Sequence, residues 1–432
     1  MMLWAEGVLA GLLSLAAFKS CSRLGRIPFL FYYLGYLVTT AIGALIIYAT
    51  RTEAILQVFI FSGMDIGALP ARLPDAYLHL LFLPFIVVST TLLCLRAIFS
   101  EKPQGRLAAP QAAQDHPGVI LALLAMCICY GLFCVIRVGM FPIGMFTAGT
   151  QNIILLRYSM NSALGGTYLS ITAVVLPTLA VAFLVLFLRD RKRTYLYALL
   201  VAVFADFYFL SATFSKGGFI SLLFYLIGGW AAVARLRPRI IAGAAFAAFG
   251  LFSFMTFQSS GSGTPMLLVA LLAVRDIIFR LAVAFPFFVL LFPGVLPPPG
   301  PDVGLMFFNI GPSYPLITTV NDYMYPAVGI AQGSVTAPSH VMSYAEAGWG
   351  WATATLILTA ATIFWTGRAA HNIKSSMGVA VFVATCVSLY FTTQGGFFST
   401  FQVYYGCLWA WLTYCAYHLL VWFNRITSGT AP

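Results

Sequence analysis

The sequence predicts an all-α, polytopic membrane protein with about eleven transmembrane helices (roughly 10–12) and one large outer loop that contains amphipathic helices. Three observations predict this fold. Of the 432 residues, 61% are hydrophobic and 8% are charged, against about 25% charged residues in soluble domains. Apolar segments of about 20 residues, the length that crosses a bilayer, recur along the chain. The basic residues gather in alternate loops, as they do between membrane spans.

The predicted spans are dense in the first part of the chain and resume near its end. They cover residues 3–18, 28–50, 75–98, 118–138, 168–188, 194–212, 217–234, 240–257, 344–366, 376–393 and 401–423. This spacing divides the chain into a first transmembrane bundle of about eight helices at 1–257, the large loop at 258–343 and C-terminal transmembrane helices at 344–432.

The loop charges orient the predicted spans. The basic runs "RDRKR" at 189–193 and "RLRPR" at 235–239 fall on the same side of the membrane, together with most of the 23 Lys and Arg residues. Basic loops stay on the cytoplasmic side, so the N-terminus and the loop 258–343 are predicted to face outward. Because the basic residues are spread over short loops, their pattern indicates membrane topology and does not favour nucleic-acid binding.

The segment "LLAVRDIIFRLAVAF" at 271–285 places Arg275, Asp276 and Arg280 among apolar residues, where topology does not explain them. Two interpretations stay open. Asp276 and Arg280 lie four residues apart and can pair on one helix face, with Arg275 reaching toward water. Alternatively, Arg275 or Arg280 binds an anion, because a guanidinium group matches phosphate geometry and stays charged in a poorly hydrated site.

Two further outward cations lie beside glycines. Lys216 in "SATFSKGGFISLLF" falls at the N-terminus of a predicted helix, where free N–H groups favour an anion and glycine permits close approach. A tight turn with an interfacial lysine is an equally good interpretation. Arg157 in "NIILLRYSMNSALGGTYLS" precedes another predicted span and a glycine pair.

The segment "APSHVMSYAEAGWGWA" at the end of the large loop contains two candidate bases, His340 and Glu346. Histidine titrates near neutral pH, and a buried carboxylate can accept a proton from a hydroxyl group. The alternatives are an interfacial loop histidine and a buried acid paired with an arginine. Asp322 and Tyr323 lie earlier in the same loop, among aromatic and amide residues of a kind that suits sugar rings.

Other chemistries find little support. The eight cysteines lie in or beside apolar segments, and no Cys/His cluster has zinc spacing. The acidic residues form neither a paired motif nor a triad dense enough for a divalent cation. The sequence contains no G-x-S-x-G motif. We therefore expect no metal or other cofactor.

Together, "SATFSKGGFISLLF", "LLAVRDIIFRLAVAF" and "APSHVMSYAEAGWGWA" resemble segments of the Wzy polysaccharide polymerases, also called O-antigen or oligosaccharide repeat-unit polymerases. The similar features are a small-residue turn with a cation at a helix start, an Arg-bearing helix that opens the large periplasmic loop, and a Pro-to-Gly segment that re-enters the membrane. The large loop and the number of spans are also similar to those of this family.

The resemblance implies a metal-independent, GT-C-like membrane glycosyltransferase of the bacterial inner membrane, with its active site facing the periplasm. Its substrates would be oligosaccharides linked to undecaprenyl pyrophosphate, and it would work with a Wzz-like chain-length regulator and a flippase. The implied roles are pyrophosphate contacts for Arg275, Arg280, Lys216 and Arg157, and a base drawn from Glu346, His340, Asp276 or Asp322.

Three alternatives remain at this point. An O-antigen ligase uses the same donor, but that family follows its histidine with asparagine, whereas His340 is followed by Val341. A lipid-linked oligosaccharide transporter would carry charges through its spans and an internal repeat, and neither is visible. A structural subunit without chemistry would not need the charged residues of the large loop.

Overall fold

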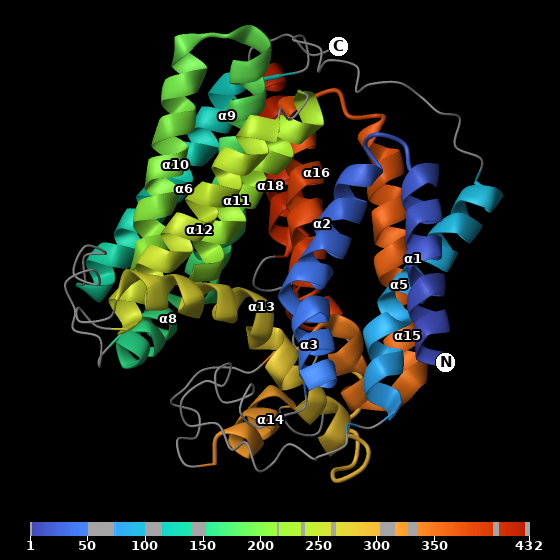
Figure 1. Cartoon of the computed structure of the whole chain (residues 1–432). Helices are drawn as coiled ribbons and strands as arrows, with labels where there is room; N and C mark the ends of the chain where they lie inside the picture. The colour runs from blue at the N-terminus through green and yellow to red at the C-terminus, as the bar shows by residue number, and fades with distance from the viewer. Residues whose placement is uncertain are drawn as a thin grey trace. The chain divides into compact units, whose positions relative to one another are not determined.

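A computed structural model describes the chain in several ranges, within which every regular element is a helix (Figure 1). The described residues are 2–50, 73, 75–99, 115–139, 153–213, 216–234, 238–260, 265–302, 316–326, 336–400 and 406–427. The chain divides into two compact units, each assembled from separate stretches of sequence. Unit 1 comprises Met1–Gln104, Ala270–Gly367 and Leu389–Thr400, and unit 2 comprises Gly105–Val269, Arg368–Ser388 and Phe401–Pro432.

Unit 1 contains the first helices of the chain and those around the large predicted loop. They are α1 (Met2–Ser20), α2 (Arg26–Tyr36), η1 (Leu37–Ala41), α3 (Ile42–Thr50), α5 (Asp75–Ile98), most of α13 (Met266–Leu291), α14 (Leu316–Met324), most of α15 (Ser339–Ala370) and α17 (Phe397–Ser399). Helices α1 and α5 run side by side (Figure 1).

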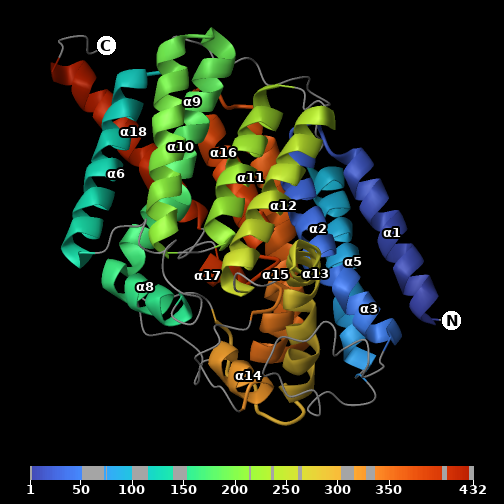
Figure 2. The same cartoon turned by 60° about the vertical axis from the view of Figure 1, so that its left-hand side comes forward.

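Unit 2 is built around the middle of the chain. Its helices are α6 (Pro117–Val138), α8 (Ile153–Ser170), η5 (Ile171–Val175), α9 (Leu176–Asp190), α10 (Arg193–Thr213), α11 (Lys216–Val233), α12 (Pro238–Ser260), most of α16 (Ser376–Phe391) and α18 (Cys407–Thr427). Figure 2 shows α10, α11 and α12 running side by side.

The helices have the length and composition of membrane spans. In the described part, six are long and apolar enough to cross a bilayer: Arg26–Ala49, Asp75–Ile98, Pro117–Val138, Ser162–Asp190, Arg193–Ala212 and Ser339–Ala370. Gly218–Val233 and Ser376–Phe391 are shorter apolar helices. Large apolar side chains are exposed on α6, α10 and α18, among them Phe133, Ile136, Phe204, Leu419 and Phe423, as expected of surfaces that face lipid.

These observations confirm a helical membrane protein. Six predicted spans coincide with the six long apolar helices, and those at 217–234 and 376–393 coincide with the two shorter ones. The remaining predicted segments, 3–18, 240–257 and 401–423, overlap helices α1, α12 and α18. The total of eleven spans and the outward position of residues 258–343 stay predictions.

The core of unit 1 forms where the second half of α13 packs against the N-terminal helices. Phe285, Phe287 and Phe288 are fully buried in this core. A side-chain carbon added at Gly43 in α3 would lie 2.7 Å from the Ala282 Cβ atom and would collide with the Ile278 carbonyl oxygen. Glycine therefore lets α3 approach the backbone of α13, as small residues do between membrane helices.

The core of unit 2 is centred on α9, which packs against α10, α11 and α6. All residues of α9 from Leu176 to Leu186 are buried. A helix that is buried on every side needs no polar face, which explains why this stretch is apolar all round. Tyr168 fastens α8 to α10, because its hydroxyl group donates to the Phe209 carbonyl over 2.9 Å.

Two of the membrane helices contain a π-helical turn. Helices α2 and α3 are joined through η1, and α8 and α9 are joined through η5. Helix α8 also bends at Gly165, whose φ of 78° lies in the left-handed region that favours glycine. The sequence predicted the spans but neither the π-helical turns nor this bend.

We predict that Gly43→Ala destabilises the protein although alanine is the better helix former. Alanine replaces glycine in a helix interior with a gain of about 0.5–1 kcal/mol, whereas overpacking costs about 1–3 kcal/mol. Thermal unfolding of the purified protein in detergent measures the balance. Gly11→Ala in α1 is the matched control, because a Cβ atom at Gly11 has no neighbour within 4 Å. A melting temperature for Gly43→Ala equal to that of Gly11→Ala would contradict the close approach of α3 and α13.

Candidate functional site

Helix α13 holds the charged segment singled out in the sequence. The pair considered there was Asp276 with Arg280, whose side chain lies outside the described part, whereas the structure shows Asp276 paired with Arg275. The Arg275 Nη2 atom donates to Asp276 Oδ1 over 3.0 Å, and Arg275 Nε donates to the same oxygen over 3.3 Å. The two side chains are 19% and 16% exposed, so this ion pair is partly desolvated. A neighbouring carboxylate thus offsets part of the Arg275 charge on an otherwise apolar helix.

His340 lies in the core of unit 1 as the second residue of α15. Its Nε2 atom is 3.1 Å from the Leu80 carbonyl oxygen and therefore donates to it. The ring meets Tyr36 edge-on with centroids 5.4 Å apart, and it meets Phe285 in the same manner at 6.4 Å. The imidazole is completely buried, so its observed contacts position α15 against α5 and α13.

Glu346 joins α15 to the segment that follows α13. Its Oε2 atom accepts hydrogen bonds from Trp351 Nε1 at 3.0 Å and from the Asp302 backbone N–H at 3.3 Å. Its backbone carbonyl accepts a bond from the Gly300 N–H at 3.0 Å. In the described part of the chain, the partners of this buried carboxylate are N–H groups and not an arginine.

The helix bends immediately after Glu346. Ala347 has φ −153° and ψ 20°, and Gly348 has φ 78°, so both leave the helical conformation. A positive φ is easily adopted by glycine and strained for other residues. The short first part of α15 therefore ends at the carboxylate, where the segment 300–302 is fastened.

Asp322 and Tyr323 lie together on α14 and are both exposed. The opposite face of this helix is buried through Leu316, Val320 and Met324, which makes α14 amphipathic as predicted for the large loop. The Tyr323 ring meets Phe287 of α13 edge-on with centroids 6.2 Å apart, which anchors α14 on α13.

The described contacts bring several of these residues to one half of α13. Phe285 touches His340, and Phe287 touches Tyr323. Arg275 lies ten residues before Phe285, which corresponds to about 15 Å along a helix. The remaining predicted cations are on helices: Arg157 in α8, Lys216 as the first residue of α11, and Arg280 in α13. Their side chains lie outside the described part of the structure.

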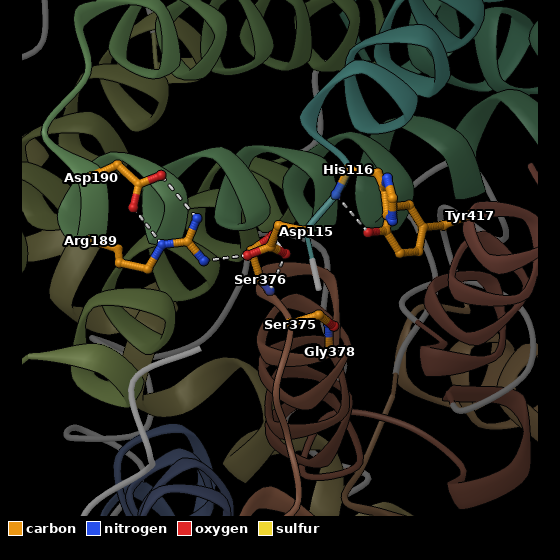
Figure 3. A network of polar contacts seen from close by, with 8 residues as sticks. All are labelled: Asp115, His116, Arg189, Asp190, Ser375, Ser376, Gly378 and Tyr417. Atoms are coloured by element: carbon orange, nitrogen blue, oxygen red, sulfur yellow. Dashed lines mark hydrogen bonds and ion pairs between the residues drawn. The ribbon is translucent and has the colours of Figure 1, made fainter. Parts of the chain in front are cut away.

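A second polar group, in unit 2, was not predicted from the sequence. Asp115 accepts hydrogen bonds through Oδ1 from the Ser376 N–H at 2.8 Å and the Ser376 hydroxyl at 2.7 Å (Figure 3). Its Oδ2 atom forms an ion pair with Arg189 Nη1. Arg189 also donates to Asp190 through Nε at 2.5 Å and Nη2 at 2.9 Å.

This cluster of Asp115, Arg189, Asp190 and Ser376 connects helix ends. The carboxylate of Asp115 lies at the N-terminus of α16, and the guanidinium group of Arg189 lies at the C-terminus of α9. Each charge is favourable at the end of the helix macrodipole where it sits. Just beyond Asp115, the His116 N–H donates to the Tyr417 hydroxyl of α18 over 3.1 Å (Figure 3).

The sequence contains only a weak signal for this cluster. Asp115 lies two residues before Pro117, a pattern typical of a helix start. The run that includes Arg189 and Asp190 was interpreted through topology alone. No local pattern connects Asp115 with Ser376, which is 261 residues away. Within the ranges that the structure covers, no group of three or more His, Cys, Asp or Glu residues could hold a metal ion.

The fold and these polar groups define a helical membrane protein with partly buried charges in both of its units. Comparison with known proteins adds no closer assignment. No protein-family model matches the chain, no curated protein is similar to it, and no solved structure matches it.

We predict that Asp115→Ala strongly destabilises the protein. Removing one partner of a buried ion pair costs about 3–5 kcal/mol, because the other charge stays without its partner, and the Asp115 side chain is 1% exposed. Thermal unfolding in detergent should show a large fall in melting temperature. Asp322→Ala is the control, since this exposed residue of α14 should change the temperature little. Equal temperatures for the two variants would argue against a stabilising role of the cluster.

A second comparison tests the contacts of Glu346. Glu346→Ala removes the acceptor of two N–H groups, and each unsatisfied buried donor costs about 1–3 kcal/mol. Glu346→Gln keeps an acceptor oxygen and should retain most of the stability. The melting temperatures of the two variants and of the wild type rank the three proteins by stability. If Glu346→Gln were as unstable as Glu346→Ala, the negative charge and not the hydrogen bonds would hold the segment 300–302.

Proposed function

We propose that the chain is a polysaccharide polymerase of the bacterial inner membrane. It transfers a growing glycan from undecaprenyl pyrophosphate to a new lipid-linked repeat unit at the periplasmic face. The observation that supports this function best is the partly desolvated Arg275–Asp276 pair on an apolar helix. A polyprenyl pyrophosphate has its tail in lipid and its charge near the membrane surface, so its site needs cations on such a helix.

The donor is held through its pyrophosphate group. Arg275 supplies one guanidinium group, and Arg280 on the same helix is the further cation of the proposed site. When the bond between the anomeric carbon and the pyrophosphate oxygen breaks, negative charge grows on that oxygen. Preorganised cations stabilise this charge more than that of the intact donor, which is the requirement for catalysis.

The acceptor is a hydroxyl group on the terminal sugar of the second lipid-linked unit. Its oxygen bonds to the anomeric carbon, its proton passes to a base, and the lipid pyrophosphate leaves. Among the candidate bases, Glu346 is favoured over His340 because His340 is enclosed by Tyr36, Phe285 and the Leu80 carbonyl. Glu346 also lies at the bend formed by Ala347 and Gly348, and not within the aromatic contacts that hold His340.

The exposed face of α14 completes the proposed site. Asp322 and Tyr323 offer a carboxylate and an aromatic ring, which suit the hydroxyl rim and the apolar face of a sugar. A chain-length regulator and a flippase are the partners that such a polymerase requires. An O-antigen ligase would use the same donor and differ only in its acceptor, so the acceptor is the variable that an experiment must control.

We predict that the purified protein lengthens an undecaprenyl-pyrophosphate-linked repeat unit in steps of whole repeats. Arg275→Ala should slow this reaction by about 10²–10³-fold, the effect of losing one stabilising donor. Glu346→Gln should slow it by about 10²–10⁴-fold, as expected for a general base. Gel separation of the products measures the rate, and Arg239→Ala, an exposed arginine of α12, is the control.

Three results would argue against this function. Absence of a ladder, with a folded protein and the repeat unit of its own organism, would favour the ligase if glycan then moved to a lipid A core acceptor. A full rate for Arg275→Ala would remove that residue from the donor site. A full rate for Glu346→Gln would leave Glu346 with the structural contacts to Trp351 and Asp302 alone.

A further inference from the structure

Asp206 is an acidic residue in the interior of unit 2. It lies on α10 in a buried stripe at helical spacing with Ala202, Ala205, Phe209 and Leu210. Its side chain is 0% exposed. Neither of its carboxyl oxygens has a hydrogen-bond partner among the described residues. Ionisable residues inside membrane helices are costly and are usually functional, so Asp206 requires an explanation.

Two side chains of α11 that carry hydroxyl groups are also buried inside unit 2. Ser221 and Tyr225 lie four residues apart and therefore on one helix face. Both are completely buried. The Ser221 hydroxyl oxygen has no hydrogen-bond partner in the described ranges, and the Tyr225 hydroxyl lies beside the Thr178 side chain of α9 and near Asp206. Because α10 packs directly against α11, three buried polar side chains come from two neighbouring helices.

The side chains around Asp206 bear on whether its carboxyl group is ionised or neutral. Helix α9 and η5 present no ionisable residue between Ile171 and Leu188. Helix α8 contributes Tyr168, whose hydroxyl is bonded to the Phe209 carbonyl. Helix α6 contributes Tyr130 and Cys134, the latter beside Tyr168.

Arg137 at the end of α6 is exposed. The side chains described around Asp206 thus supply no counter-charge, while those of Arg157 in α8 and Lys216 in α11 lie outside the described part of the structure. An ionised carboxylate buried without a counter-charge costs several kcal/mol, and such a group neutralises by binding a proton.

We propose that Asp206, with the hydroxyl groups of Ser221 and Tyr225, forms a proton-binding site inside unit 2 that exchanges its proton with water. In the protonated state Asp206 is a neutral carboxylic acid. On release, its O–H bond breaks, a water molecule takes the proton, and the carboxylate remains. The Ser221 hydroxyl group, which has no partner in the described residues, and the Tyr225 hydroxyl group, which would turn from Thr178, are the donors that would stabilise that carboxylate.

The backbone near Asp206 contains an irregular turn that could rearrange when the proton is released. The π-helical turn η5 packs against both α10 and α11. π-Helical turns are rare in proteins, and many of those that occur lie at functional sites. The chemistry proposed here is separate from the proposed glycan transfer, whose Arg275 and candidate base Glu346 belong to unit 1.

Infrared spectroscopy of the purified protein in detergent tests the proposal. We expect the wild type to show the carbonyl stretch of a protonated carboxylic acid at neutral pH, and we expect this band to shift in D₂O. Asp206→Asn should lose the band. Asp75→Asn, which changes an exposed aspartate at the first residue of α5, should retain it. Aspartate labelled with ¹³C in the wild type should shift the band even if Asp206→Asn does not fold.

Other outcomes overturn the proposal. Absence of a protonated-acid band in the wild type shows that Asp206 is ionised, and an unchanged band after long exposure to D₂O shows that the proton does not exchange. A band that disappears when sodium chloride replaces choline chloride shows that a sodium ion competes for the carboxylate, and the site is then a cation site. A Ser221→Ala,Tyr225→Phe double variant should move the band, and an unmoved band removes these hydroxyl groups from the site.

Discussion

Lipid provides no hydrogen-bond partners, and the rest of this structure depends on that constraint. Its buried charges find their partners within the protein. Asp115 has Arg189 and the first N–H group of α16, Arg275 has the carboxylate next to it, and the Glu346 carboxylate has the Trp351 side chain and the Asp302 backbone N–H. The contacts of Asp115 lie at helix ends and those of Glu346 lie at the bend of α15, where unpaired N–H and C=O groups would otherwise be left over. Polar interactions therefore determine where the helices of each unit begin and join.

The same constraint assigns different roles to the two candidate bases. His340 satisfies one ring nitrogen on the Leu80 carbonyl and fills an aromatic environment, so it behaves as a packing residue with a polar anchor. Glu346 sits where α15 stops being regular, and its carboxylate accepts bonds from the Trp351 side chain and from the Asp302 backbone N–H of the segment before α14. Its position is thus fixed by hydrogen bonds at a break in the helix. Chemistry is easier to accommodate there than in a filled core.

Much of the helical pattern could be predicted from the sequence, because a membrane span requires a long apolar segment. The segment predicted at 118–138 forms Pro117–Val138, and the one at 75–98 forms Asp75–Ile98. Boundaries that depend on tertiary contacts were less accurate. Helix α15 begins at Ser339 instead of 344. The Thr392 carbonyl, distant in sequence, accepts the Ser339 N–H at this helix start, and His340 is the second residue of the helix. The contact between Asp115 and Ser376 joins distant parts of the chain, so no pattern of neighbouring residues contains it.

The π-helical turn η5 has a consequence for the evolution of the chain length. A π-helical turn contains one residue more than the α-helical turn that it replaces. In an ordinary span, an inserted or deleted residue rotates all later side chains by about 100°, from the protein interior toward the lipid. Residues Ile171–Val175 form a place where the span Ser162–Asp190 can gain or lose one residue and keep the buried face of α9 in register. Homologous chains should therefore differ in length by a single residue at this turn more readily than elsewhere in the span.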